Sequence, residues 1–185
     1  SGPPTILAVG RLVEKKGFEH LVRAMRIAGD RSVFRARVVG DGPLRASLEA
    51  LAVASGLSDR IEFLGWRSGG EVSRLMSEAD LFVAPSVTAA DGDMEGMPLV
   101  ISEALATGLP VIGSRHSGIP EVVLDGENGL VVEERDVQGL ASGLIHFSDE
   151  GNRLRAASNA RRTAETRFCS TKQGDELLKL LESIA

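Results

Sequence analysis

The stretch from Asp80 to Ala106, DLFVAPSVTAADGDMEGMPLVISEALA, predicts a strand, a polar loop and a helix in direct succession. The run LFVAP is almost entirely apolar and stops at a proline, which is typical of a parallel strand that is covered on both faces. Pro98 suits the first turn of a helix, and the residues after it are mostly apolar. A strand joined in this way to a helix is the unit from which a parallel α/β sheet is built.

The same alternation runs along the whole chain. Short apolar or β-branched runs that end in Gly, Pro or Ser predict strands at 5–10, 34–40, 61–64, 81–85, 111–114 and 129–132. Amphipathic stretches predict helices at 17–28, 43–55, 69–79, 98–107, 119–124, 137–146, 150–168 and 172–184. We therefore predict one α/β domain over 5–185, a Rossmann-like doubly wound parallel sheet of about six strands with helices on both faces. Residues 1–4 are interpreted as a cloning scar or linker remnant.

The composition argues against several classes of function. The 185 residues carry a net charge of -5, which disfavours a general electrostatic attraction to nucleic acid. Aromatic residues make up only 4%, too few for surfaces that stack bases or sugar rings. The apolar runs are far too short to span a bilayer. The single cysteine, Cys169, has no second cysteine to pair with, so we expect a reducing compartment and a cytoplasmic location.

Parallel α/β sheets bind ligands at the carboxyl ends of their strands, so the loops after the predicted strands are the candidate binding segments. The first loop, GRLVEKKG, runs from Gly10 to Gly17 and ends where a helix begins, a position that favours anions. Two of its three cations, Arg11 and Lys16, are suited to clamp a diphosphate, Arg as a fork and Lys as a point charge. On its own, such a loop is more often a solvated basic turn.

The second and third loops carry glycines that let a ligand approach the backbone. Residues 38–44, VVGDGPL, match part of a dinucleotide fingerprint at Gly40, but Arg45 stands where the third glycine should be. We interpret this segment mainly as a tight turn between a strand and a helix. Gly65 and Trp66 end the third strand. The glycine would admit a base or ring there, and the tryptophan would serve the ligand or simply shield the sheet edge.

The fourth loop points most clearly to a ligand. Glu95 lies just before the helix that begins at Pro98, and Glu103 lies inside it, about 7.5 Å along its axis from Pro98. Between the two carboxylates, the N–H groups from Gly96 to Leu99, where Pro98 itself has none, lack helical partners. Because the helix is otherwise apolar, we expect Glu103 to be buried and to need a partner. Two acceptors on either side of an anion-binding helix end suit a nucleotide sugar, which has hydroxyls at both ends and phosphates between them.

Other polar residues, and simpler interpretations of the two glutamates, stay open at this point. Glu95 would otherwise only complement the helix dipole, and Glu103 would be an ordinary exposed residue. His116, in the fifth loop, is a candidate contact for a sugar or phosphate, although a single loop histidine is more often structural. Asp91 and Asp93 lack a third ligand and are expected to cap turns rather than bind a metal. No Cys and His spacing predicts a zinc site, and no Ser–His–acid set can be assembled.

Several segments follow one another in a characteristic order: VGRLVEKKG at 9–17, VGDGP at 39–43, IEFLG at 61–65, ADLFVAPS at 79–86, EGMPLVISEA at 95–104, GLPVI at 108–112, SGIPE at 117–121 and DGENGL at 125–130. From residue 6 to 168, this order resembles the nucleotide-sugar-binding domain of the retaining GT-B glycosyltransferases of group 1, family 4. The Glu-x7-Glu spacing of Glu95 and Glu103 is similar to that family's signature. The segment ADGDMEG at 90–96 further resembles enzymes of bacterial exopolysaccharide assembly.

The resemblance implies a role for each matching residue. Arg11 and Lys16 would bind the donor diphosphate and stabilise the leaving nucleotide, while Glu95 would contact hydroxyls of the transferred sugar. Glu103 would bind the ribose, and the backbone near Gly65 would hold the base. The remaining donor-binding positions would be Gly10, Gly40, Trp66, Gly96, Met97 and Leu99. The donor would be a nucleoside-diphosphate sugar, and no metal or other cofactor is implied, because the cations and the helix end neutralise the diphosphate.

A complete enzyme of that family also has an N-terminal domain, which carries the acceptor site. The resemblance therefore implies that this chain is the C-terminal half of a GT-B fold and does not transfer sugar on its own. The helix at 172–185 has an apolar stripe that is expected to pack on the absent domain. The implied partners are a nucleotide sugar and, through that domain, a carbohydrate or lipid-linked acceptor. The full-length protein would lie in the cytoplasm, with a peripheral place at the inner membrane face as the other option.

Three other classes of function remain as alternatives. A nucleotide-sugar epimerase or a sugar phosphorylase would share the architecture, but the Glu-x7-Glu pair favours a transferase. An NAD-dependent oxidoreductase domain is disfavoured by Arg45 at the third glycine position, although Asp59 and Glu62 lie near the offset expected for its acidic residue. A non-enzymatic α/β interaction module gives no reason for charged residues to gather at the strand ends.

Overall fold

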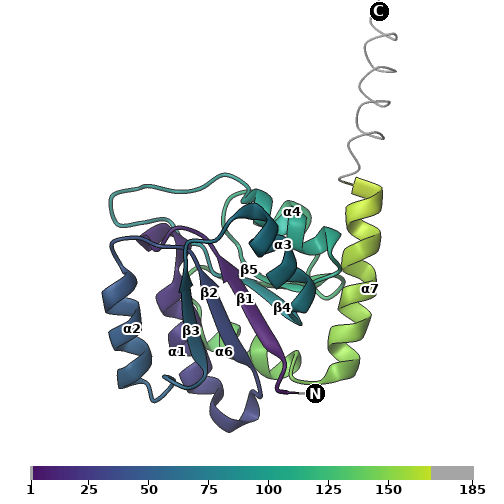
Figure 1. Ribbon diagram of the computed structural model, residues 1–185. Helices are drawn as coiled ribbons and strands as arrows, with labels where there is room; N and C mark the ends of the chain where they lie inside the picture. The colour runs from purple at the N-terminus through teal and green to yellow at the C-terminus, as the bar shows by residue number, and fades with distance from the viewer. Residues whose placement is uncertain (1, 168–185) are drawn as a thin grey trace, which may run out of the picture.

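A single six-stranded parallel sheet forms the centre of the computed structural model, which describes residues 2–167 (Figure 1). The strands are β1 Thr5–Val9, β2 Arg35–Val39, β3 Ile61–Gly65, β4 Leu81–Ala84, β5 Val111–Ser114 and β6 Gly129–Val132. The helices are α1 Phe18–Ala28, α2 Arg45–Ala54, α3 Gly69–Glu78, α4 Leu99–Ala106, α5 Ile119–Val122, α6 Val137–His146 and α7 Glu150–Arg167, with short 3-10 turns at Glu14–Lys16 and Gly29–Arg31. The predicted fold class is confirmed.

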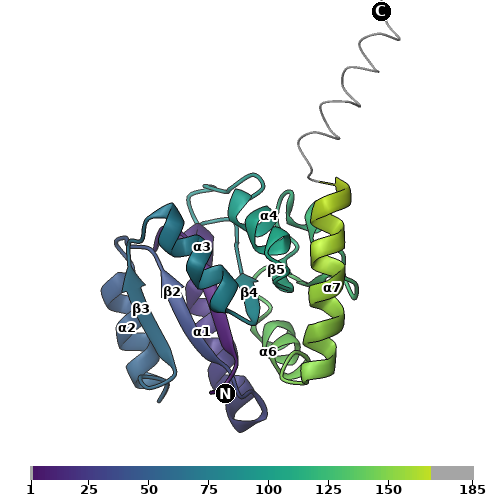
Figure 2. The ribbon, with the colours of Figure 1, turned by 45° about the vertical axis from the view of Figure 1, so that its right-hand side comes forward.

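Helices cover both faces of the sheet, because successive side chains of each strand point to opposite sides. One core joins Ile6, Ala8 and Val83 of the sheet to α1, α2 and α6. The other joins Leu7 and Phe82 to α3, α4, α5 and α7. In both ribbon views α7 runs beside α4 (Figures 1 and 2). Burial from both sides explains why every residue of β4 is buried and why its sequence is continuously apolar.

The strand order places the two most charged loops next to each other. The order is β3-β2-β1-β4-β5-β6, so the chain moves outward from β1 to β3 and then returns to the other side of β1. Ile6 of β1 therefore pairs with Leu81 of β4. The reversal of strand order between β1 and β4 is the topological switch point at which open α/β sheets bind ligands. The loops after β1 and β4 are the first and fourth loops of the sequence.

The predicted element bounds differ from the observed ones by at most two residues. The helix predicted at 43–55 begins at Arg45 because the preceding residues form a turn in which the N–H of Arg45 donates to the carbonyl of Gly42. Cys169 and the predicted helix at 172–185 lie outside the described residues. None of the helices between residues 2 and 167 combines the length and the apolar character needed to cross a bilayer.

Candidate functional site

The loops after β1, β2 and β3 pack directly on one another through glycines. The N–H of Gly10 donates to the carbonyl of Val39, and the N–H of Gly40 donates to the carbonyl of Gly65, both at 2.9 Å. A Cβ atom on Gly40 would lie 1.9 Å from the carbonyl oxygen of Gly10. The atoms closest to Gly40 therefore belong to the backbone of the first loop. Glycine is needed at this position so that the two loops can pack against each other.

The first loop is also joined to the end of β4. Gly17 adopts a left-handed conformation with φ +63°, and a Cβ atom there would lie 1.9 Å from the carbonyl oxygen of Pro85. Two residues earlier, the carbonyl of Lys15 accepts a 2.9 Å hydrogen bond from the N–H of Val87. These backbone contacts hold the basic first loop against the start of the acidic fourth loop.

Lys16 and Glu95 meet where these two loops touch. They form an ion pair across 79 positions of sequence, and their side chains are only 17% and 12% exposed. The other oxygen of Glu95 accepts a hydrogen bond from the hydroxyl of Ser86, whose own carbonyl accepts one from the hydroxyl of Ser114. The stem of Lys16 lies on Gly10, where an added Cβ atom would be 3.0 Å from its Cε. A cation and a carboxylate are thus fixed side by side.

The N-terminus of α4 adds free hydrogen-bond donors beside this pair. Its N-cap, Pro98, offers no side-chain acceptor. The backbone N–H groups of Gly96 and Met97 find no acceptor among the described residues, and that of Leu99 lies in the first turn, where helices lack internal partners. Met97 also packs against the fifth loop, since a Cβ atom on Gly118 would lie 3.0 Å from its Cβ. The geometry presents N–H groups to an anion at the carboxyl edge of the sheet.

Arg11 is exposed, and its guanidinium has no hydrogen-bond or ion-pair partner among residues 2–167. It belongs to the same loop as Lys16, so both predicted cations of that loop stand at the carboxyl edge. Of the predicted site residues, Lys16 and Glu95 are therefore brought into direct contact, while Arg11 leaves its charge free for a ligand.

One expectation about a predicted site residue is wrong, and one of the two interpretations left open for another is excluded. Glu103 is exposed rather than buried, because α4 turns Ile101, Ala104 and Leu105 to the core and leaves Glu103 on the opposite side. No described residue pairs with its carboxylate. Trp66 is 73% exposed and does not shield the edge strand β3 that precedes it. Both side chains are exposed, Trp66 directly after the carboxyl end of β3 and Glu103 in the second turn of α4.

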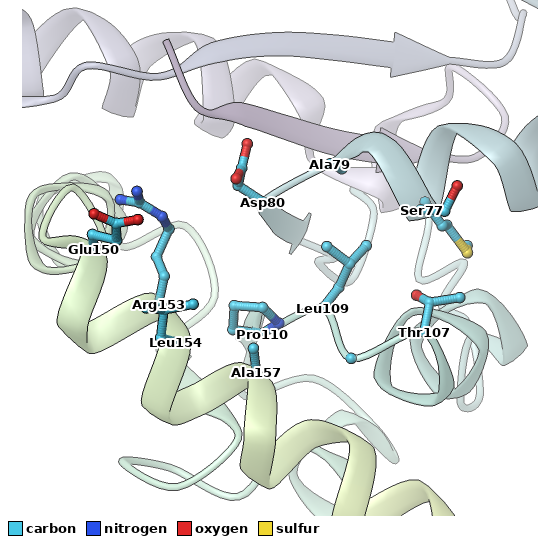
Figure 3. A pocket seen from close by; sticks show the side chains of 12 residues that line it. Ser77, Ala79, Asp80, Thr107, Leu109, Pro110, Glu150, Arg153, Leu154 and Ala157 are labelled. Carbon is cyan, nitrogen blue, oxygen red and sulfur yellow. The ribbon is translucent and has the colours of Figure 1, made fainter. Parts of the chain in front are cut away.

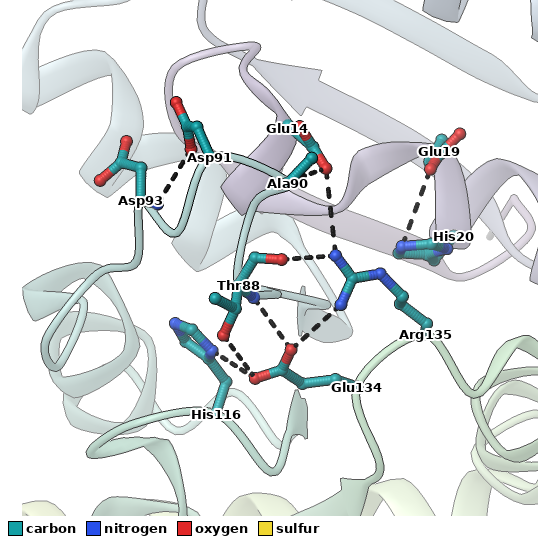
Figure 4. A network of polar contacts seen from close by, with 10 residues as sticks. All are labelled: Glu14, Glu19, His20, Thr88, Ala90, Asp91, Asp93, His116, Glu134 and Arg135. Atoms are coloured by element: carbon teal, nitrogen blue, oxygen red, sulfur yellow. Dashed lines mark hydrogen bonds and ion pairs between the residues drawn. The ribbon is translucent and has the colours of Figure 1, made fainter.

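A polar network beside the site was not singled out by the sequence (Figure 4). The carboxylate of Glu134 accepts hydrogen bonds from the N–H of Thr88 at 2.9 Å and from Nδ1 of His116 at 2.6 Å. Arg135 donates to the carbonyl of Thr88, and Glu14 accepts from the N–H of Ala90 at 2.9 Å. The network fixes the fourth loop to three other loops. Because a carboxylate can only accept, His116 carries a proton on Nδ1.

His116 is completely buried in this network, which favours the structural interpretation of that residue over direct ligand contact. Its Nε2 has no hydrogen-bond partner among the described residues. Burial alone would raise the pKa of Glu134, but the hydrogen bonds from Thr88 and His116 outweigh burial and hold that pKa below its ordinary value. Folding therefore favours the ionised carboxylate. Its stabilising contribution is present above the ordinary glutamate pKa, about 4.3, and is lost as the pH falls through the lower pKa of the folded state.

Glu134→Gln is expected to lower the free energy of unfolding at pH 7 by about 1 to 2 kcal/mol, because hydrogen bonds to a charged group are weakened. The difference between variant and wild type should shrink as the pH falls from the ordinary glutamate pKa, about 4.3, through the lower pKa of the folded state, because the wild-type carboxylate then also loses its charge. Urea unfolding at pH 7 and at pH 3.5 measures both effects. Glu133→Gln is the matched control, since Glu133 is exposed and, among residues 2–167, its carboxylate pairs only with Arg115. Equal losses in the two variants would show that the network does not stabilise the loop.

The two aspartates of the fourth loop were both expected to cap turns, but only Asp91 does so. Asp91 accepts a 2.9 Å hydrogen bond from the N–H of Asp93, and Asp93 in turn forms a 2.9 Å ion pair with Lys15. Within the described part of the chain, no group of three His, Cys, Asp or Glu side chains is placed to hold a metal ion. The predicted capping role of Asp91 is therefore observed, and Asp93 forms a second link between the first and fourth loops.

A separate cavity of about 180 Å³ lies near the opposite edge of the sheet (Figure 3). It is bounded by the segments that lead into β4 and β5, with Asp80 and Pro110 among its residues, and by Arg153 and Leu154 of α7. None of the predicted site residues lines it. Arg153 is already bonded to the carbonyls of Phe147 and Ser148, so its charge is held by the protein itself.

Comparison with known proteins places these features in a family context. The model of the family described as Glycosyl transferases group 1 matches residues 1–163. The amylovoran biosynthesis glycosyltransferase AmsK of Erwinia amylovora is 39% identical over 99% of this chain, which covers 46% of that protein. The chain therefore spans about half the length of the curated relatives that it matches.

Solved structures give the same architecture. HepE of Anabaena, crystallised in complex with UDP, superposes with a TM-score of 0.84 at 28% identity, covering 98% of this chain and 49% of that one. The C-terminal domain of a group 1 family protein, LpcC of Francisella tularensis, superposes with a TM-score of 0.81 at 26% identity, covering 91% of this chain and 88% of that domain. The six-stranded sheet and its helices thus match a C-terminal domain of known structure.

Proposed function

Because this chain belongs to the glycosyl transferases of group 1, we propose that it binds a nucleoside-diphosphate sugar between its first loop and the N-terminus of α4. The observation that carries this proposal is the contact of Lys16 with Glu95 across 79 positions of sequence. It brings a cation, a carboxylate and the free N–H groups of α4 to one edge of the sheet. The UDP bound to HepE, a protein of the same architecture, supports a nucleotide as the ligand.

The proposed donor-binding roles follow from charge and position. Arg11 and Lys16 bind the diphosphate with the N–H groups of Gly96, Met97 and Leu99. When the bond between sugar and phosphate breaks, negative charge develops on the leaving diphosphate, and donors that are already oriented stabilise it. Glu95 accepts hydrogen bonds from hydroxyls of the transferred sugar. These groups supply enough positive potential for the diphosphate that we propose no metal ion for the step.

The finer points of the reaction rest on the family resemblance. We propose that transfer retains the anomeric configuration and that the acceptor is held by a part of the polypeptide outside this chain. This chain would then bind donor without transferring sugar, because the reacting groups are not brought together. The similarity to a glycosyltransferase of amylovoran biosynthesis favours an acceptor in bacterial exopolysaccharide assembly. A carbohydrate or lipid-linked acceptor fits that proposal.

Nucleotide binding by the 185-residue chain is the test of the proposed function. Isothermal titration with UDP, GDP and ADP, with their sugar forms and with NAD, should give measurable binding of at least one nucleoside-diphosphate sugar. Binding of NAD alone would favour the oxidoreductase alternative. Absence of binding by every compound would overturn the proposal.

Glu103→Ala is expected to weaken the binding of the nucleotide with the highest affinity about tenfold, because the proposed hydrogen bond between the Glu103 carboxylate and the ribose is lost. Inorganic pyrophosphate should bind the variant and the wild type equally, since it has no ribose. Glu103 is exposed and has no partner among the described residues, so the substitution should leave the fold intact. Glu121→Ala is the control, because Glu121 is also exposed and lies on α5, which packs on the same face of the sheet as α4. If the binding of pyrophosphate weakens as much as that of the nucleotide, the proposal that Glu103 binds the ribose is wrong.

A further inference from the structure

The cation and the carboxylate that the donor is proposed to need are bonded to each other. Nζ of Lys16 contacts one oxygen of Glu95, and the hydroxyl of Ser86 donates to the other. A diphosphate that binds Lys16 therefore competes with Glu95 for the same ammonium group. Both side chains are largely shielded from solvent, so this competition is screened less than between exposed charges.

The outcome of this competition depends on what the diphosphate carries. A nucleotide sugar brings hydroxyl donors that can bond the Glu95 oxygen released from Lys16. A nucleoside diphosphate that has lost its sugar brings no such donors, so the released carboxylate would stay unpaired beside a second anion. An unpaired, shielded charge is costly. Glu95 should therefore penalise the spent nucleotide and not the intact donor.

We propose that Glu95 is a specificity-determining residue that discriminates the sugar-charged donor from the spent nucleoside diphosphate by exchanging its partner at Lys16. This role rests on the proposed function of the site and adds to it. When the donor binds, the ammonium group of Lys16 leaves Glu95 and contacts the phosphate, while the carboxylate of Glu95 accepts hydrogen bonds from the sugar. When the sugar has left, Glu95 returns to Lys16 and weakens the hold on the diphosphate. The exchange thereby favours product release.

Glu95 is held in a way that permits such an exchange. Ser86 and Ser114 are both buried, and the hydroxyl of Ser114 fixes the carbonyl of Ser86. The bond from Ser86 to Glu95 does not involve Lys16, so it can persist in either state. The neighbouring pair of Lys15 and Asp93 has the same charges in the same two loops, but Asp93 is 55% exposed and well solvated. It provides a matched control that removes one negative charge from the same loop.

Isothermal titration with inorganic pyrophosphate, UDP and UDP-glucose, and in parallel with GDP and GDP-mannose, tests the exchange. Glu95→Gln should raise the affinity for pyrophosphate and for the nucleoside diphosphates about fivefold, because the internal competitor for Lys16 is lost. The affinity for the sugar nucleotides should not rise. The ratio of the affinity for a sugar nucleotide to the affinity for the free nucleotide should therefore fall. Asp93→Asn should change pyrophosphate affinity less than about twofold. Glu95→Ala should give the same signs with a different side-chain shape.

The double variant Lys16→Met/Glu95→Gln separates competition at Lys16 from a general loss of negative charge. In the Lys16→Met background, Glu95→Gln should raise pyrophosphate affinity much less than it does in the wild type. A decrease or no change of pyrophosphate affinity in Glu95→Gln, or an equal gain in Asp93→Asn, would overturn the discrimination while leaving donor binding in place. Failure of the wild type to bind every compound would overturn the proposed function itself. Thermal unfolding of each variant verifies that it is folded.

Discussion

Replacing Gly17 with alanine is expected to lower the free energy of unfolding by about 3 kcal/mol or more, a loss that few single substitutions reach. Two costs add at this position. The residue has φ +63°, which an alanine adopts only with strain, and its Cβ atom would lie 1.9 Å from the carbonyl oxygen of Pro85. Backbone cannot yield as a flexible side chain does. Either the first loop or the end of β4 must move.

Gly56→Ala is the matched control, because Gly56 has φ +69° and no atom within 4 Å of an added Cβ. It should cost only the left-handed strain, about 1 kcal/mol. Urea unfolding of the two variants at pH 7 gives the comparison. Similar losses in both would mean that the contact between the first loop and β4 contributes little to stability.

Lys16→Met is expected to weaken the binding of nucleoside diphosphates about thirtyfold, within the range for losing one hydrogen bond to a charged group. The methionine keeps much of the stem that lies on Gly10 but removes the charge. Every base should be affected alike, because the proposed contact is with phosphate. Isothermal titration with UDP, GDP and pyrophosphate measures the effect.

Lys15→Met is the control for charge alone, since Lys15 is the adjacent residue and pairs with the exposed Asp93. Lys15→Met should weaken the binding of the same compounds less than about twofold, because exposed ion pairs are screened. Equal losses in the two variants would indicate a general electrostatic attraction of the loop rather than a defined contact at Lys16.

Most of the fold could be predicted from the sequence because local signals agree with tertiary structure. The continuous apolar run of β4 predicts burial on both faces, and glycines and prolines mark the strand ends. The helix α3 begins at Gly69, the first residue of the predicted range, and the structure shows a capping box formed there by Ser68 and Glu71. The strand ends also predict which loops lie at the same edge, so the approach of Lys16 to Glu95 follows from topology.

The side-chain environments were harder to predict. An apolar helix such as α4 was expected to bury Glu103, but the sequence does not tell which face of a short helix meets solvent, and Leu99 is itself 72% exposed. Glu134 and Arg135 stand in a charged run, EER, that is typical of a solvated turn. Their contacts with Thr88 depend on the path of a loop 46 residues away in sequence, on which local patterns carry no information.

The place of β4 beside β1 has a consequence for the stage of folding at which the proposed binding site forms. The strands β1, β2 and β3 are synthesised before β4. The fourth loop, which contacts the first loop, is therefore absent until about half of the domain has been made. The Lys16–Glu95 contact closes a span of 79 residues, and contacts between residues so distant in sequence form slowly, because the entropy of loop closure opposes them. A nascent chain released after β3 would hold the basic loop with no fourth loop to complete it. The proposed nucleotide binding would therefore report that both halves of the sheet have joined.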